Sequence, residues 1–569
     1  MKKIDSSTFD PMTSVSRRKF LAGATGTAGM LALGSAPSVF AQQQPALAKS
    51  GKGMVTSPHT LATEAGLKVL REGGNAIEAA IAMGSVIAVT YPHFCGIGGD
   101  AIWIVADSTG RQTTLMGIGQ AAEKIPAYTG GSIPLRGAGS TVSSACTVDT
   151  WGKAHEFSTK NWGGKKSFAS LLDAAIGYAE NGFPTTASQV FWHDFRKDDV
   201  ANWDGFGKIF MPDGKPRKVG ENFVQADLAR SLKLIAKNGA RDFYEGELAT
   251  RIAKGLAAVG SPLTASDLKR TQTKEAAPAS LDYRGVTLLA PPSPTQGIST
   301  LEIMGILREF DLKSVPEGSA DYYHLLVEAV KQAFLDRPGI ADPDFVRQPV
   351  ERWLSKEHLS RKAAAIDKAK AMPWPHVFKT GDTVYFGATD SEGRSVSILQ
   401  SVYFDWGSGV VVGDTGMIWQ NRGAAFSLDP KSPNVIKPGK RPFYTLNPGM
   451  ALKDGKPHVL YGTQGADGQP QTLSVVLTRL LDYKLDPLQA LARPRFLLGK
   501  TFSDSRDSLK LERDAGTEVF KELARRGHEM SPIASNSPLG GQAGAIVIHG
   551  DGRIEGAHDP RSDGMALGL

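Results

Sequence analysis

A strand–turn–strand pattern starts directly after Gly381 and constrains the fold more than any other feature of the chain. Thr383 to Thr389 is rich in residue types that favour strands, and Ser395 to Phe404 has the pattern of the returning strand. Between them, Ser391-Glu392-Gly393 is a three-residue turn with glycine at the position that takes positive φ. The pattern predicts an antiparallel hairpin and a β-rich second half of the chain.

The turn also predicts which residues face each other across the hairpin. Because it is centred on Glu392, paired residues have numbers that sum to about 784, which places Ser401 opposite Thr383 within one residue. Hydroxyl groups at this spacing on neighbouring strands can hydrogen-bond. Two alternatives stay open at this point: a glycine bulge in the turn would shift the register by one, and strand propensity alone explains a threonine here.

A second strand runs into a glycine loop that opens a helix. The loop extends from Tyr461 to Gly468, Pro470 suits a first helical turn, and an apolar helical pattern continues from Leu473 to Leu481. Free backbone N–H groups at such a loop can stabilise negative charge developing on an oxyanion. An ordinary turn would use the same glycines, so the residues alone leave both interpretations open.

The rest of the chain divides into an α/β first part and a β-rich second part. Helical periodicity from Pro58 to Val86 is broken at Gly73-Gly74, and residues 311–320 and 337–381 have the composition of surface connections. Further helices are expected over Phe168–Glu180, Gln225–Asn238 and Tyr322–Leu335. Strands are expected over Ala101–Ala106, Gly409–Val412, Met417–Trp419, Gly449–Leu452, His458–Tyr461, Ser508–Leu511 and Ala545–His549.

Composition and motifs exclude several classes of protein. The chain is 41% hydrophobic and 22% charged, which is a globular balance and not that of a disordered chain. Its two cysteines, Cys95 and Cys146, exclude a disulfide framework and a four-cysteine zinc site, and are expected to be two buried thiols or one bridge. No G-x-S-x-G, H-E-x-x-H or P-loop motif occurs, so no metal or organic cofactor is expected. Gly117 to Ala122 mimics a dinucleotide fingerprint, but Pro126 falls where its helix would continue.

The first 41 residues have the pattern of an export signal. Ser16 to Leu21 contains a twin-arginine motif, a weakly apolar run follows, and Val39-Phe40-Ala41 is a small-residue cleavage site. We therefore expect a periplasmic or secreted protein without a stable membrane anchor, a retained N-terminal anchor being the alternative. Removing residues 1–41 takes five basic and two acidic residues from a formal net charge of +7 and leaves about +4, which disfavours nucleic-acid binding.

Many ordered stretches of the chain resemble the gamma-glutamyltransferase family. The matching stretches are Gly53-Met54-Val55, Pro58 to Gly66, Gly73 to Ala80, Pro92 to Gly99, Gly182-Phe183-Pro184, Phe243 to Gly246, Asp342 to Val346, Asp382-Thr383, Phe404 to Val411, Lys440-Arg441-Pro442 and Pro494-Arg495-Phe496. The resemblance covers nearly all of the chain after the signal. It implies an α/β (α+β) N-terminal-nucleophile hydrolase fold, an αββα sandwich of two sheets between helical layers.

The resemblance also implies a proenzyme that cuts itself between Asp382 and Thr383. Residues 42–382 would form a large subunit and residues 383–569 a small one. Thr383 would be the nucleophile and its freed α-amine the base, since an α-amino pKa of about 7.7–8.0 leaves much of it neutral near physiological pH. Ser401 matches the family's second hydroxyl, and Gly465 and Ala466 match its oxyanion pair. The sequence leaves open whether the two subunits associate further into a heterotetramer.

Departures from the family pattern fall on the residues that hold the glutamyl group. The family's carboxylate-binding arginine is replaced within Ile118-Gly119-Gln120, and its amine-binding acidic pair is absent from Gln420 to Ser427. A charge-assisted hydrogen bond contributes about 1.5–3 kcal/mol. Losing both the arginine that binds the carboxylate and the acidic pair that binds the amine therefore weakens glutamyl recognition by orders of magnitude. The substrate-binding candidates that the resemblance leaves are Tyr403, Asn421, Arg422, Tyr444, Thr445 and Gln464. Arg422 could supply a new positive contact or lie at the surface.

The altered pattern is similar to the family's branch of small-amide hydrolases. The oxamate amidohydrolase of that branch shares a run like Asp467 to Thr472. The first hypothesis is therefore an exported, self-processing amidohydrolase that acts on a small amide or a γ-glutamyl compound, with hydrolysis favoured over transfer. The alternative hypothesis is a non-catalytic protein on the same fold that binds a small ligand.

Overall fold

The computed structural model describes residues 46–203, 205–374, 382–500 and 506–569, which all belong to one compact unit. The predicted export signal, residues 1–41, and the expected start of the large subunit at residue 42 lie outside the described residues. Among the described helices, none combines the length and the apolar character that crossing a bilayer requires.

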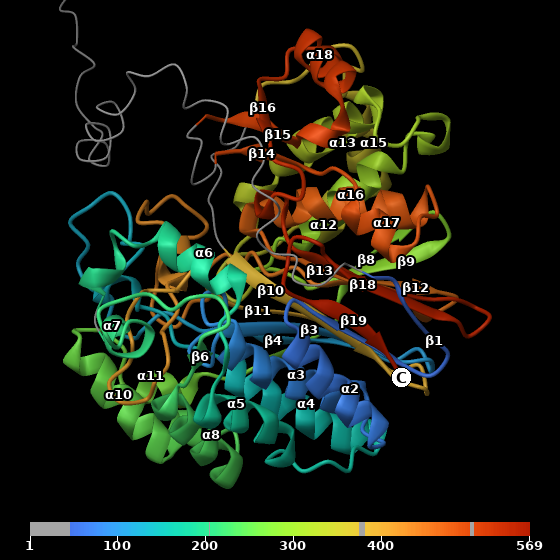
Figure 1. The fold of residues 1–569 in the computed structure, drawn as a ribbon. Helices are drawn as coiled ribbons and strands as arrows, with labels where there is room; N and C mark the ends of the chain where they lie inside the picture. The colour runs from blue at the N-terminus through green and yellow to red at the C-terminus, as the bar shows by residue number, and fades with distance from the viewer. Residues whose placement is uncertain (1–45, 204, 375–381, 501–505) are drawn as a thin grey trace, which may run out of the picture. The chain divides into compact units, whose positions relative to one another are not determined.

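Two seven-stranded sheets form the centre of the fold (Figure 1). The first contains, in order, β19 (Met565–Gly568), β2 (Met54–Ser57), β10 (Asp382–Thr389), β11 (Ser395–Tyr403), β3 (Asp100–Ala106), β4 (Gln112–Gly117) and β7 (Lys274–Ala276). The second contains β1 (Ala48–Ser50), β18 (Ile554–His558), β17 (Ala543–Ile548), β13 (Lys456–Thr463), β12 (Gly449–Lys453), β9 (Val286–Ala290) and β8 (Ala279–Tyr283). Smaller sheets pair β14 (Phe496–Gly499), β15 (Ser508–Glu512) and β16 (Met530–Ile533), and β5 (Phe183–Pro184) with β6 (Asn222–Phe223).

Helices cover the outer face of each large sheet. The first sheet carries α2 (Thr60–Arg71), α3 (Ala76–Thr90) and α4 (Thr147–Trp162), with α5 (Asp173–Asn181) and α8 (Ala226–Asn238) packed behind α3. The second carries α12 (Gly297–Leu307), α16 (Gln469–Leu481) and α17 (Pro487–Ala492), with α13 (Ala320–Phe334), α15 (Lys356–Ala364) and α18 (Thr517–Arg525) beyond them. The remaining helices are α6 (Ala187–Phe195), α7 (Phe206–Phe210), α9 (Asp242–Glu245), α10 (Glu247–Ala258), α11 (Ala265–Arg270) and α14 (Val350–Trp353). The αββα order expected from the resemblance is therefore confirmed.

The inner faces of the two sheets approach closely because glycines make room for one aromatic ring. A Cβ added at Gly462 or at Gly544 would lie 2.1 Å or 2.7 Å from the ring of Tyr385, closer than side-chain carbons come. The Ser397 hydroxyl on the first sheet donates to the Tyr461 carbonyl on the second at 3.1 Å. These contacts fix the position of β10, which carries Thr383, against β13, which leads to the glycine loop.

The predicted hairpin forms with the predicted register over most of its length. Val384 pairs with Gln400 and Thr389 with Ser395, so the paired numbers sum as expected. Gly393 in the turn has φ of +76°. The irregularity lies at the other end, where a bulge between Asp382 and Val384 leaves Thr383 out of the regular ladder.

Several expectations for individual elements are corrected by the structure. Gly409–Val412 and Met417–Trp419 are joined by backbone hydrogen bonds, such as that from the Trp419 N–H to the Val410 carbonyl, but they form one isolated bridge, Val411 to Ile418, and not regular strands. The glycines around them take positive φ and curve the chain. The helix expected from Phe168 begins as a 3₁₀ turn and becomes α-helical at Asp173. The segment that starts at residue 337 is no simple surface connection: α14 and α15 lie within it, and Arg337 and Asp342 are buried.

Candidate active site

Two side-chain hydroxyl groups contact the carbonyl oxygen of the peptide bond between Asp382 and Thr383. Both residues are buried at the start of β10. The Thr383 hydroxyl lies 2.7 Å from the Asp382 carbonyl oxygen, and the Ser401 hydroxyl lies at the same distance from it. The bulge in β10 is the local reason that the Thr383 side chain turns back toward the preceding carbonyl.

Ser401 links the two strands at this point. Its hydroxyl oxygen accepts the Tyr403 N–H at 2.7 Å and lies 3.3 Å from the Thr383 hydroxyl. With the Tyr403 N–H bound to its oxygen, the Ser401 proton points to the Asp382 carbonyl and polarises it. The sequence-based pairing of Thr383 with Ser401 is thus observed as a direct contact.

The Asp382 side chain is buried beside other charged groups. Burial, and after it the charge of Asp405, raise the pKa of the Asp382 carboxyl well above its usual range, against a lowering hydrogen bond from Gln464. That bond runs from Gln464 Nε2 to Asp382 Oδ1. Asp405 itself is held by a bidentate pair with Arg196 and by Arg136. A carboxyl group in this position favours its protonated form.

The glycine loop after β13 lies next to this peptide bond. Gln464, one residue before Gly465, makes the contact with Asp382. Gly465 has φ of +128°, which only glycine adopts readily, and Ala466 has φ of +45° and begins a 3₁₀ turn to Gly468. The Ala466 N–H therefore has no acceptor inside its own turn. Pro470 lies in the first turn of α16, as its position in the sequence suggested.

Two residues that sequence reasoning missed hold the glycine loop. Gln296 Nε2 donates to the carbonyl oxygens of Thr445 at 2.7 Å and Ala466 at 2.6 Å. Arg337 donates to Gln296 Oε1 at 3.0 Å and pairs with Asp467 in the loop. Their positions before α12 and after α13 carry no motif, so no sequence signal could have identified them.

Arg422 is fully buried between two aromatic rings. Its guanidinium carbon lies 3.6 Å from the centre of the Tyr403 ring and 3.9 Å from that of Tyr444, and Nη1 donates to the Thr445 hydroxyl at 3.2 Å. Within the described part of the chain, Nε and Nη2 have no hydrogen-bond partner. The alternative that Arg422 lies at the surface is therefore wrong, because Tyr403 and Tyr444 enclose it.

The two remaining substrate-binding candidates are engaged with the protein. Asn421 Nδ2 donates to the Leu135 carbonyl at 2.8 Å, and its Oδ1 accepts the Phe404 N–H at 3.1 Å. The Tyr444 hydroxyl donates to Asp100 Oδ2 at 2.6 Å. Burial raises the pKa of Asp100 to about 6, although the bond from Tyr444 lowers it. Asp100, another residue that sequence reasoning missed, faces Ser401 in the β3–β11 ladder.

A cavity of about 350 Å³ opens beside these residues. Tyr403 and Ala425 form part of one wall, and Asp467 and Arg337 lie on the lining as well. Phe426 and residues of the short loop that follows it also line the cavity. The cavity has room for a small organic molecule next to the tyrosine that covers Arg422.

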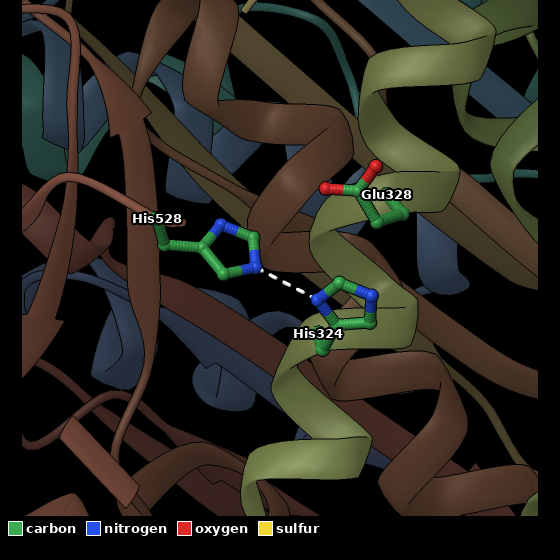
Figure 2. Close-up of side chains that lie close together, drawn as sticks. All are labelled: His324, Glu328 and His528. Carbon is green, nitrogen blue, oxygen red and sulfur yellow. Dashed lines mark hydrogen bonds between the residues drawn. The ribbon is translucent and has the colours of Figure 1, made fainter. Parts of the chain in front are cut away.

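One cluster of potential metal ligands lies away from this site. Figure 2 shows His324 and Glu328 on α13 and His528 opposite them. His324 Nε2 lies 2.8 Å from the Asp367 carbonyl and so carries the proton, which leaves Nδ1 to accept from His528 Nε2 at 2.8 Å. Glu328 is paired with Lys331 at 2.8 Å. The ligand atoms are thus used in hydrogen bonds and an ion pair, which suits a structural role.

A second such cluster groups Glu302, Asp336 and His358. His358 Nε2 and Lys362 Nζ bind Asp336 Oδ2 at 2.8 Å and 2.7 Å. Burial is the main cause that raises the pKa of the Glu302 carboxyl well above its usual range. A carboxyl group whose pKa is raised and a carboxylate already bound by His358 and Lys362 do not form a ready metal site.

The two cysteines are free and buried. Cys95 Sγ lies 3.4 Å from the Ile87 carbonyl, and Cys146 Sγ lies 3.6 Å from the Thr273 hydroxyl. Burial raises the pKa of both thiols well above the usual range. Of the two outcomes that the sequence allowed, two buried thiols are observed.

Comparisons with known proteins place this geometry in a family. The chain is 42% identical over 524 residues to the oxamate amidohydrolase proenzyme of Klebsiella pneumoniae, covering 91% of this chain and 99% of that protein. It is 40% identical over 523 residues to a glutathione hydrolase-like proenzyme of Bacillus subtilis, covering 91% and 98%. Among solved structures, the cephalosporin acylase from Bacillus halodurans matches with a TM-score of 0.85 and 31% identity, over 94% of this chain and 98% of that one.

These relatives are hydrolases and acylases, two of them described as proenzymes. A family model described as gamma-glutamyltranspeptidase matches residues 62–569, which is nearly the whole described chain. The similarity and the two sheets between helical layers also confirm the N-terminal-nucleophile hydrolase fold. The chain therefore belongs to the gamma-glutamyltranspeptidase family and is an enzyme of that family's hydrolase and acyltransferase kind.

Proposed function

We propose that the chain is a proenzyme that cuts itself between Asp382 and Thr383 and then hydrolyses small amides with Thr383 as its nucleophile. The observation that carries the proposal is the pair of hydroxyl groups, from Thr383 and Ser401, that both lie 2.7 Å from the Asp382 carbonyl oxygen. In this proposal the Thr383 oxygen attacks the carbonyl carbon, while the Ser401 hydroxyl donates to the carbonyl oxygen. The proenzymes among the relatives support the same chemistry.

Self-cleavage follows from this arrangement in two steps. The Thr383 oxygen adds to the Asp382 carbonyl carbon, its proton passes to the Thr383 nitrogen, and the C–N bond breaks, which leaves an ester between the two residues and a free α-amine. Water then hydrolyses the ester to the Asp382 carboxylate and the Thr383 hydroxyl. Ser401 stabilises the oxyanion in the first step, because its proton is directed at that oxygen.

The mature enzyme repeats the attack on a substrate amide. The freed Thr383 amine accepts the hydroxyl proton, and the oxygen attacks the amide carbonyl to form an acyl-enzyme. The N–H groups of Gly465 and Ala466 would receive the oxyanion, and the amine leaves with the proton that Thr383 gave up. Water then releases the acid. Asn421, whose amide is bound to backbone groups, supports the site by positioning the chain around it.

Purified protein tests the proposal directly. Wild-type protein should give two fragments, residues 42–382 and 383–569, and intact mass should place Thr383 at the new N-terminus. The Thr383→Ala variant should remain one chain, and a Thr383→Ser variant, which keeps a hydroxyl, should still be cut. An electrophile that mimics an amide should label Thr383 in the mature protein. A wild-type chain that stays intact and unlabelled would overturn the proposal and leave the small-ligand-binding alternative.

We also propose that the chain is exported by the twin-arginine route to the periplasm or the medium. The support is the Arg17-Arg18 pair and the small-residue site at Val39 to Ala41. Changing both arginines to lysine should retain the protein inside the cell. Export that continues unchanged in that variant would contradict the proposal.

A further inference from the structure

We infer that Arg422 binds a carboxylate on the acyl part of the substrate, so that the preferred donors are small anionic amides. The inference rests on the proposed function, since it concerns the substrate of the same site. It names a chemical class: an amide of a dicarboxylic acid whose second carboxylate is ionised, with no α-amine required.

The free edge of Arg422 has the shape of a carboxylate receptor. Nη1 is taken by the Thr445 hydroxyl, whereas Nε and Nη2 have no partner within the described residues. Nε and Nη2 lie along one edge of the planar guanidinium and point two N–H groups in parallel within that plane, which is the arrangement that binds both oxygens of a carboxylate. Because this edge is buried, leaving it without an anion is unfavourable.

Aromatic rings restrict the approach to that edge. The rings of Tyr403 and Tyr444 lie within 4 Å of the guanidinium carbon, at 3.6 Å and 3.9 Å, and cover the guanidinium. A ligand must therefore arrive in the plane of the guanidinium, where a flat carboxylate fits. The stacking also fixes the side chain without using Nε or Nη2.

The other cationic side chains around the site already have carboxylate partners. Arg136 and Arg196 both bind Asp405. Arg337 binds Asp467. Within the described chain, no salt bridge involves Arg422, which makes its positive charge the one available to an incoming anion near the candidate nucleophile.

Contacts through Tyr403 and through Thr445 connect Arg422 to both halves of the reaction centre. Tyr403, which stacks on it, pairs with Asp382 in the hairpin and donates its N–H to Ser401. Thr445, which binds it, is joined through Gln296 to the carbonyl of Ala466. A substrate whose carboxylate is bound by Arg422 would therefore lie near Thr383 and the glycine loop.

The surroundings of Arg422 do not favour an amino-acid donor. An α-ammonium group beside the guanidinium would be repelled by the like charge. The neighbouring Ala424, Ala425 and Phe426 offer no carboxylate to it, and Asp467 on the cavity lining is paired with Arg337. A small dicarboxylic amide without the ammonium group meets neither difficulty.

The first experiment compares substrates on the processed wild-type enzyme. Ammonia release would be measured with oxamate, malonamate and succinamate, with the neutral oxamide and acetamide, and with γ-glutamyl anilide followed by anilide release. At least one anionic amide should have a kcat/KM roughly 10- to 150-fold above that of the neutral amides, as a charge-assisted contact provides. Equal values for anionic and neutral amides, or a clear preference for the γ-glutamyl compound, would overturn the inference.

The second experiment substitutes Arg422. Arg422→Gln should lower the ratio of kcat/KM for the anionic amides to that for the neutral amides by a similar factor, and Arg422→Lys should restore part of that ratio. Arg525→Gln, the same change at an exposed arginine of α18, is the matched control. A uniform loss for all substrates in correctly cut Arg422→Gln would contradict the inference.

Binding separates this inference from the proposed function. Calorimetry with malonate as the probe should give a dissociation constant at least tenfold weaker for Arg422→Gln than for wild type, with or without turnover. Malonate binding that depends on Arg422 in protein without turnover would sink the hydrolase proposal and keep the receptor. Turnover and Thr383 labelling, together with malonate binding that does not depend on Arg422, would keep the hydrolase proposal and overturn the inference about Arg422. If Arg422→Gln does not fold, Arg422→Lys and the wild-type substrate comparison still decide.

Discussion

The hydroxyl oxygen of Ser401 lies 2.7 Å from the carbonyl oxygen of Asp382, nineteen residues earlier in the chain. The contact exists because β10 and β11 form one hairpin and because a bulge displaces Thr383 from the ladder. It brings a hydrogen-bond donor to the carbonyl that the neighbouring threonine would attack.

Removing the Ser401 hydroxyl should slow self-cleavage. Ser401→Ala loses the donor that stabilises the oxyanion on the Asp382 carbonyl, so the rate should fall about 100-fold. Ser401→Thr keeps the hydroxyl and should cut within about tenfold of wild type. The measurement is the appearance of residues 383–569 by intact mass after purification at low temperature. Equal rates for Ser401→Ala and wild type would show that the contact has no part in the cleavage.

The buried carboxyl of Asp382 should make the uncut chain less stable as the pH rises. Its pKa in the folded precursor is raised by burial and by Asp405, so the folded state binds a proton that the unfolded state loses above about pH 4. Stability is therefore full below that pH and is lost as the pH rises toward the folded pKa.

Two uncuttable chains isolate the Asp382 effect. Denaturant unfolding of Thr383→Ala from pH 4 to pH 8 would be compared with that of Thr383→Ala combined with Asp382→Asn, which keeps the shape without titrating. The first should lose unfolding free energy relative to the second as the pH rises, by up to about 1.4 kcal/mol per pH unit. A difference that does not change with pH would show that Asp382 titrates normally.

A buried ion network should stabilise the part of the chain that begins at Pro494. Arg495 pairs with Asp559, and Arg561 pairs with Asp559 and Glu512, all without solvent exposure. Burial raises the pKa of Asp559, but the charges of Arg495 and Arg561 outweigh it and hold that pKa below its usual range. Asp559→Asn leaves the two arginines short of an anion and should cost about 3–5 kcal/mol of unfolding free energy. Asp551→Asn, at an exposed position, should change it by no more than about 0.5 kcal/mol.

The pair of histidines in Figure 2 should make the fold sensitive to acid. Burial, then the charges of Lys331, His324 and Arg526, lower the pKa of His528 to about 3. The unfolded chain takes up this proton below about pH 6.5, so stability falls as the pH falls from there toward 3, by up to about 1.4 kcal/mol per pH unit.

Unfolding of His528→Gln in the Thr383→Ala background checks the acid sensitivity. The variant should lose less free energy than the parent chain between pH 7 and pH 4, because glutamine can donate to His324 without titrating. His155→Gln, at a half-buried histidine, is the control. A parent and variant with parallel pH profiles would rule out His528 as the titrating group.

The local parts of the site could be predicted from the sequence. The turn at Ser391 to Gly393 set the register of the hairpin, and the structure follows it from Val384 to Thr389. The break at Gly73-Gly74 also appears where the glycines predicted it, with Asn75 capping α3. Such features depend on residues a few positions apart, which is why a pattern reveals them.

Other parts of the site depend on contacts between distant segments. Gln296 and Arg337 meet the glycine loop only because α12 and α13 pack over the second sheet. The strand predicted at Gly409 is not formed, because four glycines with positive φ curve that segment. Strand propensity alone does not reveal this local effect. Asp100 was missed because its partner Tyr444 lies far along the chain.

The sequence by itself determined the hairpin, the glycine loop, the family and the residue at which the chain is expected to cut. Only the tertiary structure decided that two hydroxyls share the Asp382 carbonyl and that the charge of Arg422 is enclosed by Tyr403 and Tyr444 with one edge free. The reason is physical: hydrogen bonds in turns and caps follow from neighbouring residues, whereas the burial and pairing of a charge depend on how whole strands and helices pack around it.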